Sequence, residues 1–453
     1  MYERICSNLY LPFVDSLKKS PFQEVLAEAV HNQYLSVSQL RDLQLERLNR
    51  IIQHAATHSA YYRNALGDLA LPLTSLDQLS ELPFLDKEIL FDNRESIRTG
   101  KPHGREFEST TSGSTGIAMR FSTDSLQWAW SEAAQWRGRS WWNVGRGDRQ
   151  LVLWGRPIDD AATSGYASAL KYRLRNAVQF NTFAQFDEEK IRAIVRVLQD
   201  FQPQLVYGYG SSLGKVARYM DEFGIVLKNS GRPKIIEYTA DHMLGDEVRI
   251  ASRVMGAPVL SAYGASEAPG ISQQCWAGNS HISTDNVVIE FLRQDGTPAD
   301  PEETAEVVVT TLNNFAMPLI RYRVGDSAAF REGACRCGVN LPLMDLKIGK
   351  SVELIRTSSH ADVSAHVLDY INIHLMKDGI TGIRQFFVEQ TGIDNFRLDY
   401  IREEPFEDES VLTFQRKMRE HLGSQIAIDT QEVASIPLLP SGKRRYFKSN
   451  LEQ

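Results

Sequence analysis

The sequence of 453 residues predicts an α/β protein, with a large N-terminal domain of mixed or parallel sheets and helices and a small mobile α+β domain at its C-terminus. Three observations predict this class. Residues 1–85 have a helical pattern, short β-prone runs alternate with helix-like stretches from about residue 105, and a separate alternation follows about residue 355. Because strands that alternate with helices are typical of βαβ units, we expect a largely parallel sheet. We expect three parts. Residues 1–85 form the helical part of the large domain, residues 86–350 form its ligand-binding core, and residues 351–453 form the small domain.

The helical part contains one strong helix signal. Ser36 and Gln39 stand three residues apart, as in a capping box. Apolar residues then recur at helical spacing, at Leu40, Leu43, Leu48, Ile51, Ile52 and Ala55. This stripe predicts a helix whose apolar face packs against the core.

The core is expected to draw its strands from four short apolar runs, RQLVLWG, PQLVYGYG, PKIIEYT and APVLSAYG. Helical spacing is clearest at residues 187–200, and residues 306–314 predict a further strand in an extended or barrel-like part. The alternating elements of the small domain are RQFFVEQ, FRLDYI, a helical FQRKMREHLG and a terminal QEVASIPLL.

Composition excludes several classes of protein. The net charge is −7, and the 50 basic and 57 acidic residues form no basic block, so we expect no nucleic-acid partner. No apolar run reaches the roughly 18 residues that a membrane span needs. The first 20 residues are too polar for a signal peptide, and four cysteines make no disulfide framework. We therefore expect a cytoplasmic protein with reduced thiols and no membrane span.

Residues 109–116, Ser-Thr-Thr-Ser-Gly-Ser-Thr-Gly, combine hydroxyl side chains with two glycines. Backbone N–H groups and hydroxyls in such a loop can wrap phosphate oxygens. The loop is not a Walker P-loop, because no lysine follows the glycine in the required place. A polar loop without a ligand explains the stretch equally well.

Two further segments place aromatic and acidic residues in close succession. The segment Tyr263–Glu267 offers a ring that can cover a purine face and a carboxylate that can hold Mg²⁺. The segment Arg321–Asp326 ends in a carboxylate that can accept hydrogen bonds from both ribose hydroxyls, beside arginines that can neutralise phosphate. Taken singly, a strand-end turn with a solvated glutamate and a surface ion pair explain these segments as well.

Near the C-terminus, residues 440–445 place Lys443 after a glycine, which suits either a mobile cationic finger or a basic tail. The four signals form one ordered series: a Ser/Thr/Gly loop, Tyr-Gly-x-Ser-Glu, Tyr-Arg-x-Gly-Asp and Gly-Lys. With this series the sequence resembles the adenylate-forming superfamily of acyl-CoA synthetases, and within it the phenylacetate–coenzyme A ligases and capsular polysaccharide biosynthesis proteins. Residues 54–66 and 76–93 resemble the N-terminal helix and the following LP-x-x-x-K stretch of that group.

The resemblance implies an adenylate-forming ligase of the carboxylate–coenzyme A type. Such an enzyme uses ATP and Mg²⁺ to convert an organic acid to an acyl-AMP, and the acid is aromatic for some of these ligases. The enzyme then passes the acyl group to an acceptor such as coenzyme A. The partners implied are therefore a small carboxylic acid and a nucleotide.

The resemblance also assigns roles to residues. The implied phosphate loop is Thr111, Ser112, Gly113, Ser114, Thr115 and Gly116. The other implied nucleotide-binding residues are Tyr263 and Gly264 at the adenine, Asp326 at the ribose and Lys350 in the hinge signature. The implied catalytic residues are Lys443 and Glu267, the latter through Mg²⁺, and the acyl pocket begins at Tyr207, Gly208 and Ser211.

Cysteines and a histidine follow the two aromatic–acidic segments. Cys275 and His281 form a Cys-x₅-His pair after the first segment, and Cys335 and Cys337 form a Cys-x-Cys pair after the second. If the segments meet at one nucleotide, these residues should also be near each other, and three thiolates with one imidazole complete a tetrahedral zinc shell. Spacing alone favours ordinary reduced cysteines, since Cys-x₂-Cys is the usual pattern. The resemblance favours a structural zinc, because some members of the group have such a site.

The sequence departs from the family pattern at three places. At the hinge, the family signature Gly-Arg-x-Asp-Asp is replaced by Gly-Lys-Ser-Val-Glu (Gly349–Glu353). The Gly-Val-Asn-x-x-Pro stretch that normally follows is replaced by RTSSHADVSAH. Asp241 and His242 stand where a Gly-Glu pair is typical. Because thioester formation depends on rotation of the small domain about the hinge, the first two departures predict that coenzyme A is a poor acceptor.

Three alternatives stay open. The acyl group or AMP goes to an amine or hydroxyl acceptor, or the chain is a non-catalytic nucleotide-binding relative, or Ser114 is the nucleophile of a hydrolase. Retention of Lys443 and Glu267 argues against the second, and the lack of a G-x-S-x-G elbow argues against the third. Three tryptophans belong either to an aromatic or apolar acyl pocket or to the core: Trp141, Trp142 and Trp154. The sequence identifies neither the acid nor the oligomeric state.

Overall fold

The structure of the protein is a computed structural model. It describes the chain except for residues 1, 18, 68, 112–118, 155–169, 171, 183–185, 229–230, 242, 244, 349–353, 360–362, 366, 369–370, 373–374, 376–379, 381, 405, 407, 437–445 and 452–453. The chain divides into two compact units, one formed by residues 1–109, 121–154 and 163–350 and the other by residues 110–120, 155–162 and 351–453. Among the described residues, no helix combines the length and the apolar character that crossing a membrane requires.

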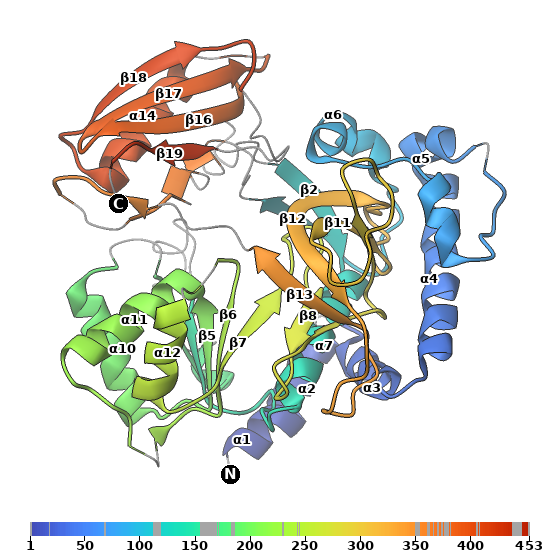
Figure 1. Cartoon of the computed structure of the whole chain (residues 1–453), viewed down its shortest axis with the longest axis horizontal. Helices are drawn as coiled ribbons and strands as arrows, with labels where there is room; N and C mark the ends of the chain where they lie inside the picture. Colours follow the sequence, from blue (N-terminus) through green and yellow to red (C-terminus); the bar gives the residue numbers. More distant parts are fainter. Residues whose placement is uncertain are drawn as a thin grey trace. The chain divides into compact units, whose positions relative to one another are not determined.

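The first unit begins with a series of helices, as the sequence predicts (Figure 1). They are α1 (Tyr2–Ile5), a π-helical turn (Cys6–Tyr10), α2 (Leu11–Leu17), α3 (Phe22–Asn32), α4 (Val37–His58), α5 (Ala60–Ala65), a 3₁₀ turn (Leu76–Glu81) and α6 (Lys87–Ile97). Ser36 and Gln39 form the predicted capping box at the start of α4. The predicted stripe along α4 is buried except at half-buried Leu43, so this face packs against the core.

The first unit is built around one sheet of eleven strands in the order β10-β11-β12-β13-β9-β8-β7-β6-β5-β3-β4. The strands are β3 (Gln150–Leu153), β4 (Ala177–Phe180), β5 (Leu205–Tyr209), β6 (Ile235–Thr239), β7 (Val259–Tyr263), β8 (Ser272–Gln274), β9 (Ser280–Ile282), β10 (Val287–Leu292), β11 (Ala305–Thr311), β12 (Tyr322–Arg331) and β13 (Leu343–Ile348). Strands β3 to β7 pair in parallel. The four predicted apolar runs form β3, β5, β6 and β7, whereas β4 was not predicted. From β7 onward every pairing is antiparallel.

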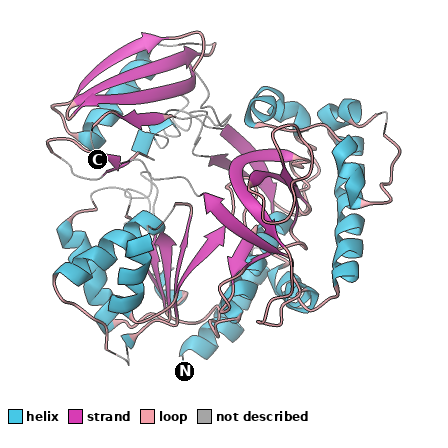
Figure 2. Ribbon diagram, viewed as in Figure 1, coloured by secondary structure: helices cyan, strands magenta, loops and turns pink. Residues whose placement is uncertain are grey.

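Three amphipathic helices connect the parallel strands: α10 (Glu188–Asp200), α11 (Gly210–Glu222) and α12 (Gly245–Met255). Figure 2 shows these helices packed beside the parallel strands. Leu151, Val206 and Ile236 share one buried cluster with apolar residues of the three helices. Because side chains alternate along a strand, the neighbouring positions Tyr207 and Glu237 lie on the opposite face of the sheet. A further helix, α7 (Ser125–Ser140), follows a two-stranded sheet of β1 (Glu106–Thr111) and β2 (Met119–Asp124).

The second unit is an α+β domain, as predicted. Its four-stranded sheet has the order β18-β17-β16-β19, formed by β16 (Ile383–Gly392), β17 (Asn395–Arg402), β18 (Ala427–Glu432) and β19 (Phe447–Ser449). The unit also contains α14 (Asp408–Leu422) and the short strands β14 (Leu354–Ile355) and β15 (Val363–Ser364). Phe414 of α14 packs on Phe386 of β16, with ring centroids 5.0 Å apart.

The predicted terminal element at residues 431–439 is displaced in the structure. The strand there is β18, which begins at Ala427 and ends at Glu432. Gly423, with a φ of +116°, ends α14 and allows the chain to turn early into the strand.

Candidate active site and metal centre

The Tyr-Gly-Ala-Ser-Glu segment begins at the carboxyl end of β7, where the sheet changes from parallel to antiparallel. Ligands of open α/β sheets bind at the carboxyl ends of strands, near topological switch points. Tyr263 is the last residue of β7, and a Cβ at Gly264 would lie 2.9 Å from the backbone nitrogen of Gly270. The position therefore requires glycine. The turn that follows leaves the Glu267 side chain buried.

The Tyr-Arg-Val-Gly-Asp segment starts β12 of the same sheet. Gly325 has a φ of +81°, and the register with β11 shifts between Glu306 and Val308. Such an irregularity re-aims the side chains that follow it. Beyond it lies Asp326, whose Oδ2 accepts a hydrogen bond of 3.1 Å from the Tyr263 hydroxyl. The structure thus brings the predicted adenine-site and ribose-site residues together.

A second tyrosine–carboxylate bond joins the two segments. The hydroxyl of Tyr322 donates to Oε1 of Glu267 at 3.0 Å, and both side chains are buried. Gln127 of α7 donates from Nε2 to the backbone carbonyl of Glu267, also at 3.0 Å. Each segment therefore supplies a tyrosine that binds the carboxylate of the other.

Sequence reasoning missed Tyr322 and Gln127. Tyr322 was visible as the aromatic residue of its segment, but its partner depends on the fold of a turn 55 residues earlier in the chain. Gln127 follows no motif, and no signal in the sequence separates it from other polar residues of α7.

Burial raises the pKa of both tyrosine hydroxyls well above the ordinary value, and the carboxylates of Asp326 and Glu267 raise it further. Both hydroxyls therefore stay protonated and act as donors. Within the described part of the chain, neither Glu267 nor Asp326 forms an ion pair with lysine or arginine. Because a buried carboxylate without a cation is costly, Glu267 suits a ligand that carries positive charge with it.

The arginine at the start of the segment has a structural partner. Arg321 donates to both carboxylate oxygens of Glu290, at 3.0 and 2.8 Å, and to the backbone carbonyl of Leu82 at 2.6 Å. Its guanidinium is therefore committed to these groups, contrary to the expectation that it neutralises phosphate. Arg323 lies over the ring of Phe84, 4.2 Å from its centroid.

The predicted acyl-pocket residues lie where β5 ends and α11 begins. A Cβ at Gly208 would meet the carbonyl oxygen of Leu153 at 2.5 Å, so glycine allows β3 and β5 to approach. The backbone N–H of Ser211 donates to Asp241 at 3.1 Å, and its hydroxyl donates to the same carboxylate. Asp241, at the position of a family departure, thereby fixes the first turn of α11.

Aromatic rings cover this end of the sheet. The Trp154 ring stacks on Tyr209 at 4.2 Å and on Tyr207 at 5.8 Å. The Arg139 guanidinium lies 4.7 Å from the Tyr207 ring centroid and forms two hydrogen bonds, of 2.9 and 2.8 Å, with Glu237. The Arg139–Glu237 pair is buried, and no sequence pattern identified it.

The rest of the predicted nucleotide site lies outside the described residues: Ser112, Gly113, Ser114, Thr115, Gly116, Lys350 and Lys443. Of Thr111, only the backbone is described, as the last residue of β1. At the far end of β2, the Asp124 carboxylate accepts hydrogen bonds from the N–H groups of Phe315 at 2.9 Å and Ala316 at 3.1 Å. This contact ties β2 to the segment that precedes β12.

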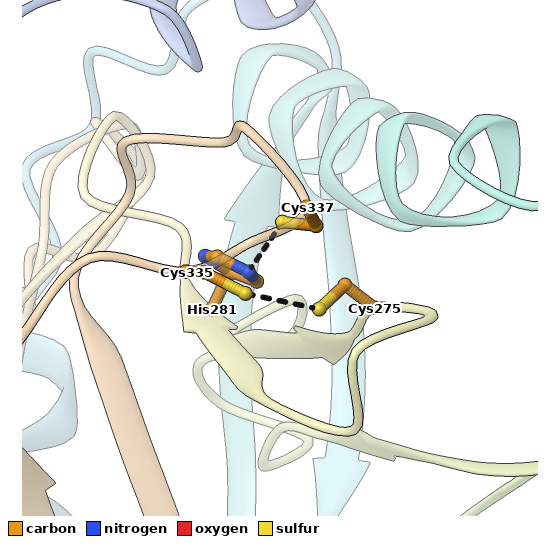
Figure 3. A group of neighbouring side chains, drawn as sticks. All are labelled: Cys275, His281, Cys335 and Cys337. Carbon is orange, nitrogen blue, oxygen red and sulfur yellow. Dashed lines mark hydrogen bonds between the residues drawn. The ribbon is translucent and has the colours of Figure 1, made fainter.

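The predicted metal ligands do come together (Figure 3). The ligand atoms of Cys275, His281, Cys335 and Cys337 all lie within 4.8 Å of one another. Sγ of Cys275 is 3.6 Å from Sγ of Cys335, and Sγ of Cys337 is 3.3 Å from Nε2 of His281. A tetrahedral zinc shell separates two sulfur ligands by about 3.8 Å, given Zn–S bonds of about 2.3 Å, so the cluster has the size that zinc requires.

Neighbouring groups orient these ligands. Nδ1 of His281 is 2.9 Å from the carbonyl oxygen of Leu341 and therefore carries the proton, which leaves Nε2 with a lone pair facing the thiols. Asn279 donates from Nδ2 to Sγ of Cys335 at 3.1 Å, as a thiolate favours. Burial raises the pKa of Cys337 to about 12, and the adjacent thiols contribute in the same direction.

Known proteins resemble this chain in sequence and in fold. No family profile matches the chain. Protein CapK of Staphylococcus aureus is 22% identical over 91% of this chain and 90% of its own length, and a phenylacetate-coenzyme A ligase of Thermus thermophilus is 25% identical over 89% and 93%. The crystal structure of 2-hydroxyisobutyryl-CoA ligase with 2-HIB-AMP and CoA, in the thioesterification state, has a TM-score of 0.59 at 16% identity, covering 92% of each chain.

The fold is that of the adenylate-forming enzymes, and the predicted superfamily is confirmed. In sequence, the chain is similar to the phenylacetate–coenzyme A ligases and to CapK.

Proposed function

We propose that the protein uses ATP and Mg²⁺ to convert an organic carboxylic acid into an acyl-AMP and then passes the acyl group to an acceptor such as coenzyme A. The observation that supports this most is the pair of bonds Tyr263–Asp326 and Tyr322–Glu267. Through these bonds the Tyr263 ring, the carboxylate that we assign to the ribose and the carboxylate that we assign to the metal ion lie close together beyond the carboxyl end of β7.

The chemistry assigns a task to each group. A carboxylate oxygen of the acid attacks the α-phosphorus of ATP, and pyrophosphate leaves with the electron pair of the broken P–O bond. Because both reactants are anions, the site must align them and supply positive charge. Tyr263 would cover the adenine, Asp326 would accept the ribose hydroxyls, and Lys443 would stabilise the charge on the α-phosphate.

Mg²⁺ fits the donor set at Glu267, a buried carboxylate without a cationic partner in the described chain. When bound, the ion neutralises phosphate charge. Tyr322 occupies Oε1 of this carboxylate, and no donor among the described residues reaches Oε2. Glu267 would therefore hold the ion through Oε2.

The acid would bind beside Tyr207, Gly208 and Ser211, where the stacked ring of Trp154 favours an aromatic or other flat acyl group. Coenzyme A is part of the names of the phenylacetate-coenzyme A ligase and of 2-hydroxyisobutyryl-CoA ligase, which supports it as the acceptor. An amine or hydroxyl acceptor is the second candidate, favoured by the departures at Gly349–Glu353. Product analysis with coenzyme A and a good acid substrate separates the two.

Acid-dependent exchange of labelled pyrophosphate into ATP, measured over a panel of carboxylic acids, tests the first half-reaction. Lys443→Ala should lose about 10²–10³-fold in exchange rate while ATP binding survives, as expected when one preorganised charge is removed. Lys448→Ala is the matched control, since Lys448 lies on β19 beside Glu389 and has no assigned role. Exchange that is equal in both variants, or absent with every acid, contradicts the proposal.

We also propose that Cys275, His281, Cys335 and Cys337 hold a structural zinc ion. The size of the cluster and the orientation of His281 support this. The ion would connect the turn between β8 and β9 to the loop before β13. It leaves no open coordination position, so it would contribute to stability and not to chemistry.

Elemental analysis of protein purified without added metal tests the zinc proposal. We expect about one zinc per chain, and about none in Cys335→Ser. Cys6→Ser is the matched control, because Cys6 is also buried but its thiol contacts the carbonyl of Leu174, away from the cluster. Less than about 0.2 zinc per chain in the wild type would show that the thiols are ordinary reduced cysteines.

A further inference from the structure

The two tyrosine–carboxylate bonds are reciprocal. Tyr263 of the first segment donates to Asp326 of the second, 63 residues later, and Tyr322 of the second donates to Glu267 of the first. Each carboxylate with a proposed ligand role is thus placed by a hydroxyl from the other segment. A buried tyrosine hydroxyl needs some acceptor, and here both acceptors are carboxylates with a proposed ligand role, so the bonds bear on the ligand as well as on the fold.

The backbone at Tyr322 pairs with a chain segment on each side of β12. The backbone on either side of this residue pairs with Leu85, through hydrogen bonds from Leu85 N–H to the Arg321 carbonyl at 3.0 Å and from Arg323 N–H to the Leu85 carbonyl at 2.8 Å. Its other neighbour is Val309 of β11. The ring is 1% exposed, so the hydroxyl has one position available.

Glu267 is held at both ends. Gln127 binds its backbone carbonyl, and Tyr322 binds its Oε1. A free glutamate side chain rotates about three bonds, and ordering it on a metal costs conformational entropy. A donor that fixes Oε1 removes this cost before the ion arrives, and a neutral donor leaves the negative charge of the carboxylate intact. A lysine or arginine in the place of Tyr322 would neutralise that charge and compete with the ion.

We propose that Tyr322 is a positioning residue that orders the Glu267 carboxylate for the Mg²⁺ of Mg·ATP, while Tyr263 orders Asp326 for the ribose. The proposal rests on the proposed function. It predicts that loss of each hydroxyl affects a different part of the ligand: the metal ion for Tyr322, and the nucleoside for Tyr263.

Calorimetry of ATP binding, in Mg²⁺ and in EDTA, tests the division. Tyr322→Phe keeps the ring and removes only the hydroxyl. We expect ATP affinity in EDTA to stay within about twofold of the wild type, and the Mg²⁺ concentration that gives half-maximal enhancement of binding to rise about tenfold, the loss expected for one hydrogen bond to a charged group. Tyr263→Phe should instead weaken ATP binding by a similar factor in both buffers.

Tyr62→Phe is the control for the loss of a buried tyrosine hydroxyl. The Tyr62 hydroxyl donates to the carbonyl of Pro318 at 3.0 Å and accepts from the N–H of Ile320 at 3.2 Å, so its loss should lower stability without changing the Mg²⁺ requirement. If Tyr322 acts only through the carboxylate, Tyr322→Phe should also have no effect on the Mg²⁺ requirement in a Glu267→Gln background.

Three outcomes overturn the inference. An unchanged Mg²⁺ requirement in Tyr322→Phe, with Mg²⁺-dependent ATP binding intact in the wild type, leaves the proposed function standing and removes the role of Tyr322. If Tyr322→Phe weakens ATP binding equally in Mg²⁺ and in EDTA, the hydroxyl of Tyr322 contributes only to the packing of the site. A wild type whose ATP binding does not respond to Mg²⁺ contradicts the metal role of Glu267 and the inference together.

Discussion

The buried pair Arg139–Glu237 offers a direct test of how a buried ion pair stabilises the packing of α7 against the parallel strands. The two side chains are 6% and 2% exposed and share two hydrogen bonds of 2.9 and 2.8 Å. The guanidinium also lies over Trp136 at 4.8 Å and over Tyr207 at 4.7 Å. Glu237→Gln removes the charge and one of the two good acceptors while the side chain keeps its size.

The expected loss of stability follows from the charge of Arg139, which stays buried after the substitution. Breaking one partner of a buried pair strands the other charge, which costs about 3–5 kcal/mol. Because the amide oxygen of the introduced glutamine side chain still accepts one hydrogen bond, we expect a loss near the lower end, about 3 kcal/mol of the free energy of unfolding. Replacing both partners with apolar residues, as Arg139→Met with Glu237→Leu, should cost less than the single substitution, because no charge stays buried.

Urea unfolding of the full chain, followed by tryptophan fluorescence, measures these differences. The control is Glu188→Gln at the exposed pair Arg192–Glu188, with side chains 55% and 59% exposed, where we expect a change below about 0.5 kcal/mol. A loss below about 1 kcal/mol in Glu237→Gln, or a double variant less stable than the single one, would refute the reasoning.

Three further predictions concern single side chains. Asp326→Asn should weaken ATP binding by about 2 kcal/mol, since the ribose would lose a charged acceptor, and calorimetry that finds no change would leave Asp326 with only its bond to Tyr263. Trp154→Ala should raise the KM of aromatic acids more than that of short aliphatic acids, because it removes the ring stacked 4.2 Å from Tyr209; an equal rise for both classes would assign Trp154 to the core. Burial lowers the pKa of His54 below its ordinary 6.5, outweighing the bond to the carbonyl of Phe315, so its contribution to stability is complete above pH 6.5 and is lost as the pH falls toward the lowered value. The decline in unfolding free energy between pH 7.5 and 5.5 should be smaller in His54→Gln, and an identical decline would show that other groups cause it.

The parallel half of the sheet was predictable because its strands and helices are long enough to show their periods. Residues 187–200 have helical spacing and become α10, and the four apolar runs become neighbouring strands. The antiparallel half was less visible, because β8 and β9 have only three residues each and no period can be read from three positions.

Within the site, what could be predicted depended on distance along the chain. The meeting of Cys275 and His281 with the Cys-x-Cys pair followed from the order of the segments. The Arg139–Glu237 pair did not, because an arginine in a helix and a glutamate in a strand are ordinary residues until the packing of α7 against the sheet brings them together. The partner of Tyr322 was hidden for the same reason.

The bridge between Leu85 and Tyr322 has a consequence for biosynthesis. Arg321, next to it, binds the carbonyl of Leu82, 239 residues earlier in the chain. Strands β3 to β7 can pair as soon as residue 263 has left the ribosome. The two carboxylates of the proposed nucleotide site take up their positions only after β12 has been made and has paired with Leu85. Contacts of such long sequence separation form slowly. We therefore expect a nascent chain that ends between β7 and β12 to have a formed parallel sheet and no capacity to bind ATP.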